Sequence, residues 1–168
     1  SEARGGTEKD GFKQYAANAK VKVELSEMIS VDLRGWYADS TVRTDGYPAP
    51  NYVFADDKSY AKATEFVGYA GVNLALLDGR FHNRFAVAYT NIGRDGFDPA
   101  AVPQHQYDSR GRNMRLEYQG IIDVNDVLSA TFGAETEKSK FSNESDYGFG
   151  ASVDSGDARL SSFYGQVI

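Results

Sequence analysis

The sequence predicts an all-β fold of about seven antiparallel strands joined as consecutive hairpins, and three observations predict it. Apolar and polar residues alternate with a period of two along glycine- and aromatic-rich segments. The alternating segments are long, roughly 11–16 residues, against a usual 5–6 for strands of globular proteins. Short turns and long loops also alternate strictly along the chain, which is typical of transmembrane β-barrels.

The alternation gives each predicted strand two chemically different faces. In each of the first six segments most apolar side chains share one parity of residue number, and most charged or amide side chains share the other. All four prolines, which cannot donate to a sheet ladder, fall between the segments. The predicted strands span residues 12–25, 29–42, 64–77, 80–94, 111–124, 127–141 and 158–168.

The short turns fix the pairing of neighbouring strands. The dipeptide Asp78-Gly79 is a type I′ hairpin signal, because both residue types tolerate the positive φ that this turn needs. Closing the three turns puts apolar residues opposite apolar ones and opposite charges face to face. The predicted pairs are Leu76 with Phe81, Asn73 with Arg84, Lys22 with Asp32, Arg115 with Glu137, and Gly120 with Phe132.

The connections are of two kinds. Three turns of two to three residues alternate with loops at 43–63, 95–110 and 142–157, roughly 15–22 residues each; in outer-membrane barrels the short turns are periplasmic and the long loops extracellular. These features predict a transmembrane β-barrel of a bacterial outer membrane. Aromatic residues of the apolar face gather toward the long-loop ends, as in a girdle at the headgroup level: Tyr15, Tyr37, Phe66, Tyr89 and Phe163.

The predicted strands do not make a closed barrel. A barrel of this class needs an even number of strands, whereas seven are predicted and the last is cut at residue 168. An unclosed sheet would leave two rows of backbone groups unsatisfied in hydrocarbon. We therefore expect residues 1–168 to begin in an extracellular loop and to form part of a barrel. Strands from elsewhere would complete this barrel. Two alternatives remain, a complete eight-stranded barrel with a structural or adhesive role and a soluble β-sandwich binding module.

Composition narrows the classes of function. The 24 acidic residues outnumber the 18 basic ones, and the formal charge of −6 argues against a nucleic-acid partner. The chain has no cysteine, which excludes thiolate catalysis and cysteine metal sites. Only His82 and His105 offer an imidazole, and neither lies in a pattern that assembles a nucleophile, a base and an orienting group. We expect no enzyme and no cofactor.

Three runs of residues, 31–40, 69–84 and 111–120, resemble the barrel of TonB-dependent outer-membrane receptors. The resemblance is strongest to the vitamin B12 (cobalamin) receptor-like branch of alphaproteobacteria, and residues 132–137 and 162–166 add to it. It implies active uptake of a bulky, scarce nutrient, either cobalamin-like or an iron siderophore. Members carry a plug domain and a TonB-interacting segment, and neither is visible in this chain. The implied partners are the bilayer with its lipopolysaccharide, the remaining strands and plug, and TonB indirectly.

The polar face and the loops supply the candidate site residues. In a large barrel the charges of the polar face would contact a plug or line a substrate path, whereas in a small barrel they would form a core of ion pairs. These lumen-facing charges are Lys22, Asp32, Arg34, Arg84, Arg115, Glu117, Glu135 and Glu137. Aromatic rings near the extracellular mouth are the candidate contacts to a bulky substrate: Trp36, Tyr47, Tyr52, Phe97 and Tyr107.

Carboxylates near the long loops offer one possible metal site. Oxygen ligands on flexible loops suit Ca²⁺, and the resembled receptors can use calcium to order such loops, but the ligand spacing of a defined calcium loop is absent. A solvated acidic surface is the simpler interpretation. The candidate ligands are Asp95, Asp98, Glu144 and Asp146.

Overall fold

The computed structural model describes residues 11–48 and 50–168, so the expected extracellular segment at residues 1–10 lies outside the described residues. The described chain holds seven strands and no helix, and hence no helix long and apolar enough to cross a bilayer. The strands are β1 (Phe12–Glu24), β2 (Ile29–Arg43), β3 (Tyr60–Leu76), β4 (Phe81–Phe97), β5 (His105–Asp123), β6 (Ser129–Ser145) and β7 (Ser152–Val167).

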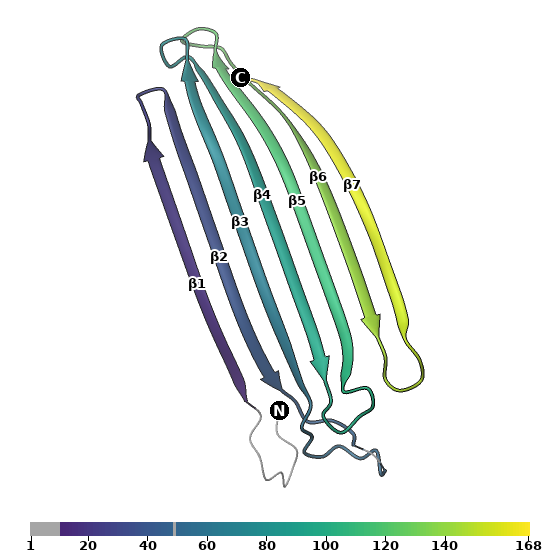
Figure 1. Cartoon of the computed structure of the whole chain (residues 1–168). Coiled ribbons are helices and arrows are strands. Elements are labelled where there is room, and N and C mark those ends of the chain that lie inside the picture. Colours follow the sequence, from purple (N-terminus) through teal and green to yellow (C-terminus); the bar gives the residue numbers. More distant parts are fainter. Residues whose placement is uncertain (1–10, 49) are drawn as a thin grey trace.

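All seven strands form one antiparallel sheet in the order β1-β2-β3-β4-β5-β6-β7, which confirms the predicted meander. Figure 1 shows the short turns at one end of the sheet and the longer connections at the other. The two edge strands β1 and β7 do not pair with each other, so the sheet is open. The described strands therefore form neither a closed small barrel nor a two-layered sandwich.

The strand registers agree with those predicted from the turns. Each of the five predicted pairs occurs in the ladders, including Leu76 opposite Phe81 and Gly120 opposite Phe132. Around the β3–β4 turn, φ is positive at Asp78 (55°) and Gly79 (86°), as predicted, and Leu77 (54°) joins them. Apolar patterning and turn chemistry were sufficient to fix the register because a slip of one residue would exchange the two faces.

The strands reach farther toward the long loops than the sequence predicts. The predicted loop 95–110 contracts to 98–104, and the predicted loop 142–157 contracts to 146–151. Ladder bonds continue into these ends, for example from Asp146 N to the Gln106 carbonyl at 2.8 Å. The prediction was short there because polar residues occupy both faces beyond the apolar stretch, so alternation disappears while backbone pairing continues.

The sheet is a single layer with almost no buried core. Among the described residues only Ala38 and Ala86 are buried hydrophobic side chains. Large apolar residues in mid-strand are instead exposed, for example Phe85 at 50% and Leu116 at 45%. A stable fold does not leave such an area in water, so the apolar face requires a covering partner.

Candidate functional site

The apolar face carries a continuous band of side chains that we call the belt. Strand parity and the ladder registers place its members on one side of the sheet. On β2 the belt spans residues 29–37 and on β5 residues 114–122, close to the 9–11 residues that a tilted strand needs to cross a bilayer. Its main members are Val21, Val23, Val31, Leu33, Tyr37, Phe66, Ala70, Val72, Phe81, Phe85, Val87, Tyr89, Met114, Leu116, Tyr118, Phe132, Ala134 and Phe163.

The belt runs obliquely across the hydrogen-bonded rows of the sheet. On β2 the belt ends at Tyr37 on the side of the long loops. The residue of β7 in the same row is Asp157, which is polar. On β7 the belt begins only at Phe163. Between β2 and β7 the loop-side edge of the belt therefore shifts by six residues along the strands, at about 3.3 Å each. These two strands are five strand spacings of about 4.8 Å apart, so the edge makes an angle of about 40° with the hydrogen-bonded rows. The short-turn end of the sheet shifts in the same direction. Phe132 of β6 shares a row with Ile29, the first residue of β2, but β6 begins three residues nearer the short turns, at Ser129.

An oblique belt with parallel edges has a simple physical origin. Strands of outer-membrane barrels tilt by about 35–45° from the membrane normal, so a horizontal apolar slab crosses them at that angle. The core face of a sandwich has no reason to shift in this way from strand to strand. The angle of the belt therefore favours a tilted barrel sheet over the core face of a sandwich, which alternation within each strand does not.

Aromatic rings border both edges of the belt. Phe66 and Tyr89 lie toward the long loops with ring centroids 6.2 Å apart. Toward the short turns Tyr118 lies between two phenylalanines, 4.7 Å from Phe85 and 6.1 Å from Phe132. The predicted girdle residues toward the loops all have belt parity. The second group was not predicted as a cluster, because its members lie on three different strands, β4, β5 and β6.

A polar group is embedded in this second aromatic cluster. The Tyr118 hydroxyl donates a hydrogen bond to Asn83 Oδ1 at 2.8 Å, and Asn83 is buried. Tyr118 and Asn83 both have belt parity, so this hydrogen bond satisfies the Oδ1 atom of a polar side chain on the apolar face.

The opposite face gathers the predicted lumen-facing charges. All eight have the parity of the polar face. Glu117 joins two of them, since it accepts from Arg84 Nη2 at 3.3 Å and from Arg115 Nε at 2.8 Å. The network links β4 to β5 on the side away from the belt.

Several ion pairs follow one strand instead of crossing to the next. Lys22 lies opposite Asp32 in the ladder, yet it contacts Glu24 at 3.2 Å while Asp32 pairs with Arg34. Residues i and i+2 share a face in a strand, so they offer an alternative to the cross-strand partner. The sequence predicted the register correctly, but the register alone does not choose between these partners.

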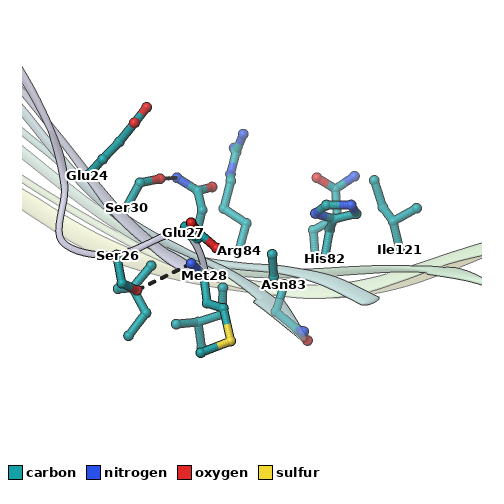
Figure 2. Close-up of a pocket in the computed structure, with 14 residues that line it drawn as sticks. Glu24, Ser26, Glu27, Met28, Ser30, His82, Asn83, Arg84 and Ile121 are labelled. Carbon is teal, nitrogen blue, oxygen red and sulfur yellow. Dashed lines mark hydrogen bonds between the residues drawn. The ribbon is translucent and has the colours of Figure 1, made fainter. Parts of the chain in front are cut away.

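A pocket of about 400 Å³ opens on the polar face near the short turns. Figure 2 shows Glu24, Ser30 and Arg84 on one side of the sheet, with Met28 and Asn83 on the other. His82 and Ile121 point to the same side as Arg84. Asn73 donates to the Ser30 hydroxyl at 3.2 Å across β2 and β3. The pocket mixes one imidazole, one guanidinium and two carboxylates, Glu24 and Glu27, with no assembled nucleophile and base.

The five predicted substrate-contact residues do not form one group. Tyr47 and Tyr52 are exposed in the loop between β2 and β3, whereas Trp36 lies within β2 on the polar face. Tyr107 covers Gly96, where an added Cβ would lie 1.9 Å from its ring. Phe97 instead has belt parity and stacks on Tyr60, with ring centroids 4.9 Å apart.

A smaller pocket of about 270 Å³ lies at the loop end and brings two of these aromatics together. It is lined by Phe97 and Tyr107, and also by Tyr147 from the loop between β6 and β7. Tyr147 was missed by the sequence analysis. Its only signal was an aromatic residue within a glycine-rich loop.

The four candidate calcium ligands are not brought together. Asp98 accepts from the Ala100 amide and Asp146 from the Gly148 amide, each at 2.8 Å, so both carboxylates serve local turns. Glu144 lies in β6 opposite Asp108. Within the described residues, the one group with the spacing of metal ligands is Asp95, His105 and Asp108, which shares only Asp95 with the prediction.

Arg110 already supplies positive charge to that group. It contacts Asp95 at 2.9 Å and Asp108 at 2.6 Å, and His105 Nε2 lies 3.2 Å from Asp95. The hydrogen bond from Arg110 holds the pKa of the Asp95 carboxyl below its usual range. The group therefore behaves as a salt-bridge cluster at the loop end, beyond the edge of the belt.

Comparison with known proteins supports the fold. The chain matches no known family model, and no curated protein matches it either. Its structure is similar to that of the siderophore receptor PiuA from Acinetobacter baumannii, with a TM-score of 0.64 and 10% sequence identity. The match covers 96% of this chain and 31% of the receptor chain, so the present chain spans about a third of that protein.

At this identity the likeness shows the fold alone. The chain has the fold of part of a receptor barrel: an open, antiparallel meander that covers a fraction of the larger structure. The match does not single out the cobalamin-receptor branch to which the sequence is most similar.

Proposed function

We propose that the chain is a segment of a TonB-dependent receptor in the bacterial outer membrane, which takes up a bulky, scarce nutrient without chemistry on it. The observation that carries the proposal is the oblique belt. Its tilt of about 40° is the tilt of outer-membrane barrel strands, and its width is that of a bilayer core. The fold match to a siderophore receptor agrees with this assignment.

The two faces have separate roles in the proposal. The belt faces lipid, and the polar face lines a lumen that holds a plug domain contributed by the rest of the protein. The pocket at the short-turn end, with Glu24, His82 and Arg84, is on the periplasmic side where polar contacts to a plug would form. Such contacts have to be broken and remade during transport, and exposed pairs of this kind are weak enough to allow it.

The cargo would first meet the loop end. Aromatic rings bind a large, partly apolar ligand well, and Tyr107 and Tyr147 line one pocket there. The acidic balance of the chain, with its net charge of −6, favours a neutral or cationic cargo over a polyanion. An iron siderophore and a cobalamin-like corrinoid both fit this description.

Two measurements test the proposal on the complete protein that contains this chain. First, we expect the purified protein to need detergent, and a monodisperse species in plain buffer would contradict the membrane assignment. Second, a host strain lacking its own receptors should accumulate a labelled ferric siderophore or labelled cobalamin when it expresses the protein. Uptake should stop when the proton-motive force is collapsed or TonB is deleted. Accumulation that continues without TonB would contradict the proposed coupling.

A further inference from the structure

The pocket at the loop end holds a carboxylate without a cation. Its described lining residues include Asp98 but no lysine, arginine or histidine. Asp98 is half-buried, and no ion pair joins it to a base within residues 11–48 and 50–168. At the neighbouring cluster, by contrast, Arg110 contacts both Asp95 and Asp108. The pocket therefore keeps a negative charge that the described chain does not neutralise.

Two side chains of the pocket are held in place and still offer an acceptor oxygen. The Ala100 amide donates to Asp98 Oδ1 at 2.8 Å, which fixes the carboxylate at the start of the connection 98–104 and leaves Oδ2 without a hydrogen bond from the described residues. Gln106 is only 9% exposed, and its Nε2 donates to the Pro103 carbonyl. Its Oε1 is therefore the free end of a fixed amide. Both free oxygens accept hydrogen bonds, so they suit a ligand that donates.

Two tyrosine rings complete the pocket on the polar side of the sheet. Gly96 and Tyr107 are paired and have polar-face parity, and an added Cβ at Gly96 would lie 1.9 Å from the Tyr107 ring. A side chain at position 96 would therefore displace this ring. Tyr147 reaches the pocket from the connection between β6 and β7. Tyr60 and Phe97 also line it, but their rings have belt parity and stack on the opposite face.

The size of the pocket limits what it can hold. Its volume of about 270 Å³ is below the roughly 300–1,000 Å³ of pockets that enclose drug-sized ligands, so it fits one side group of a bulky cargo. The faces of tyrosine rings attract cations, and the carboxylate of Asp98 does so more strongly. A compact cation with N–H donors on a short alkyl stem matches all of these parts. An anionic group would meet Asp98 with no cation between them.

We propose that this pocket binds a protonated primary amine carried by the cargo. The ammonium group donates to Asp98 Oδ2 and Gln106 Oε1, and its alkyl stem lies against the rings of Tyr107 and Tyr147. The pocket thereby selects a cargo with a free amine over the same molecule with that amine acetylated. The inference rests on the proposed function, because it requires cargo to enter at the loop end.

The first test measures the pocket without any cargo. The complete receptor is labelled with fluorotyrosine and purified in detergent, and the fluorine resonance of Tyr147, assigned with Tyr147→Phe, is followed during titration with n-butylammonium. We expect a saturable shift, whereas n-butanol, which has the same chain length and no charge, should give none. Asp98→Asn should weaken binding at least about tenfold, the effect of one lost charge-assisted hydrogen bond. The asparagine keeps an oxygen for the Ala100 amide, so the connection 98–104 should stay folded.

Asp154→Asn is the matched control for Asp98→Asn. It removes one carboxylate from the polar face of β7, opposite Asn143 and outside the pocket, and should bind n-butylammonium as the wild type does. Gly96→Ala, which displaces the Tyr107 ring, should weaken binding as well. The absence of a saturable shift in the wild type, an equal shift with n-butanol, or unchanged binding by Asp98→Asn would each overturn the site.

The second test measures selection during transport. In the host strain of the uptake assay, a labelled ferric trihydroxamate with one free terminal amine is compared with its N-acetyl form. Uptake of the amine form should be at least about tenfold faster at limiting concentration, and Asp98→Asn should abolish the difference. Equal TonB-dependent uptake of the two forms, or no uptake of the amine form, would overturn the inference and leave the proposed function standing. Uptake that continues without TonB would instead contradict the proposed function.

Discussion

The two faces of the sheet solve the problem of exposure in different ways. The polar face satisfies itself: Glu117 takes two arginines, and Asp32 pairs with Arg34 along the same strand. The belt consists mainly of apolar side chains, and residues such as Leu116 and Phe85 remain exposed. The polar face is therefore compatible with water, whereas the belt requires an apolar medium.

Because the two faces require different surroundings, the stability of the sheet depends on the medium that contacts the belt. Backbone hydrogen bonds hold the seven strands in register, but they do not distinguish one face from the other. Side-chain burial normally makes that distinction, and here the described chain buries almost nothing. Substitutions on each face test this difference when the complete protein is folded into lipid vesicles.

The largest effect is expected from a charge placed within the belt. Leu116→Lys puts an ammonium group on the apolar face of β5, next to the midpoint of the belt at Tyr118, and a charged residue at the bilayer midplane costs about 2–4 kcal/mol. The matched control is Thr131→Lys on the polar face of β6, opposite Ile121 and Gln166, which should change the unfolding free energy by under about 0.5 kcal/mol. Denaturant titration in vesicles measures both. Equal effects would mean that the two faces see the same medium.

A smaller effect is expected from the polar group inside the belt. Tyr118→Phe removes the hydroxyl that donates to Asn83, leaving a buried amide without that partner. The expected loss is about 1–2 kcal/mol of unfolding free energy, because the cost of an unsatisfied group exceeds the net value of a hydrogen bond. Tyr89→Phe, whose hydroxyl has no recorded partner in residues 11–48 and 50–168, is the control. A neutral result for Tyr118→Phe would show that water or a lipid headgroup reaches Asn83.

The belt also shows which features could be predicted from the alternation of residues within single strands and from the turns. Strand number, faces and registers followed from parity and turns, since Asp78-Gly79 permits one closure that keeps Leu76 opposite Phe81. The tilt did not follow, because it is a relation among rows on seven strands. Tyr37 and Asp157 share a row, and only the assembled sheet shows that one belongs to the belt and the other does not.

The candidate sites were harder to predict for a related reason. Parity placed all eight lumen-facing charges on the polar face, but it could not choose Glu24 over Asp32 as the partner of Lys22. Beyond the belt the alternation ends, so Phe97 and Tyr107 were assigned to a loop although they lie in β4 and β5 on opposite faces. The four carboxylates named as candidate calcium ligands serve separate turns and strands.

A modest effect is expected on the polar face. Glu117→Gln removes the charge that links Arg84 and Arg115, and both arginines remain open to solvent. Partly exposed ion pairs contribute about 0.5–1 kcal/mol, so the unfolding free energy should fall by no more than that, and less at high salt. Leu116→Lys should show no such salt dependence, because desolvation, not screening, sets its cost. A loss from Glu117→Gln as large as that from Leu116→Lys would mean that the polar face is as inaccessible to water as the belt.

The smallest effect is expected at the loop end, outside the belt. Arg110 lowers the pKa of Asp95, so the ionised carboxylate stabilises the folded state above the ordinary aspartate pKa of about 3.9. That stability is lost as the pH falls through the lower folded-state pKa. Acidification should therefore increase amide hydrogen exchange in the connection 98–104 before it affects β4 in mid-strand. In Asp95→Asn the exchange should be faster at neutral pH and nearly independent of pH in this range. If the connection in Asp95→Asn kept the wild-type pH dependence, another group would have to hold the loop end together.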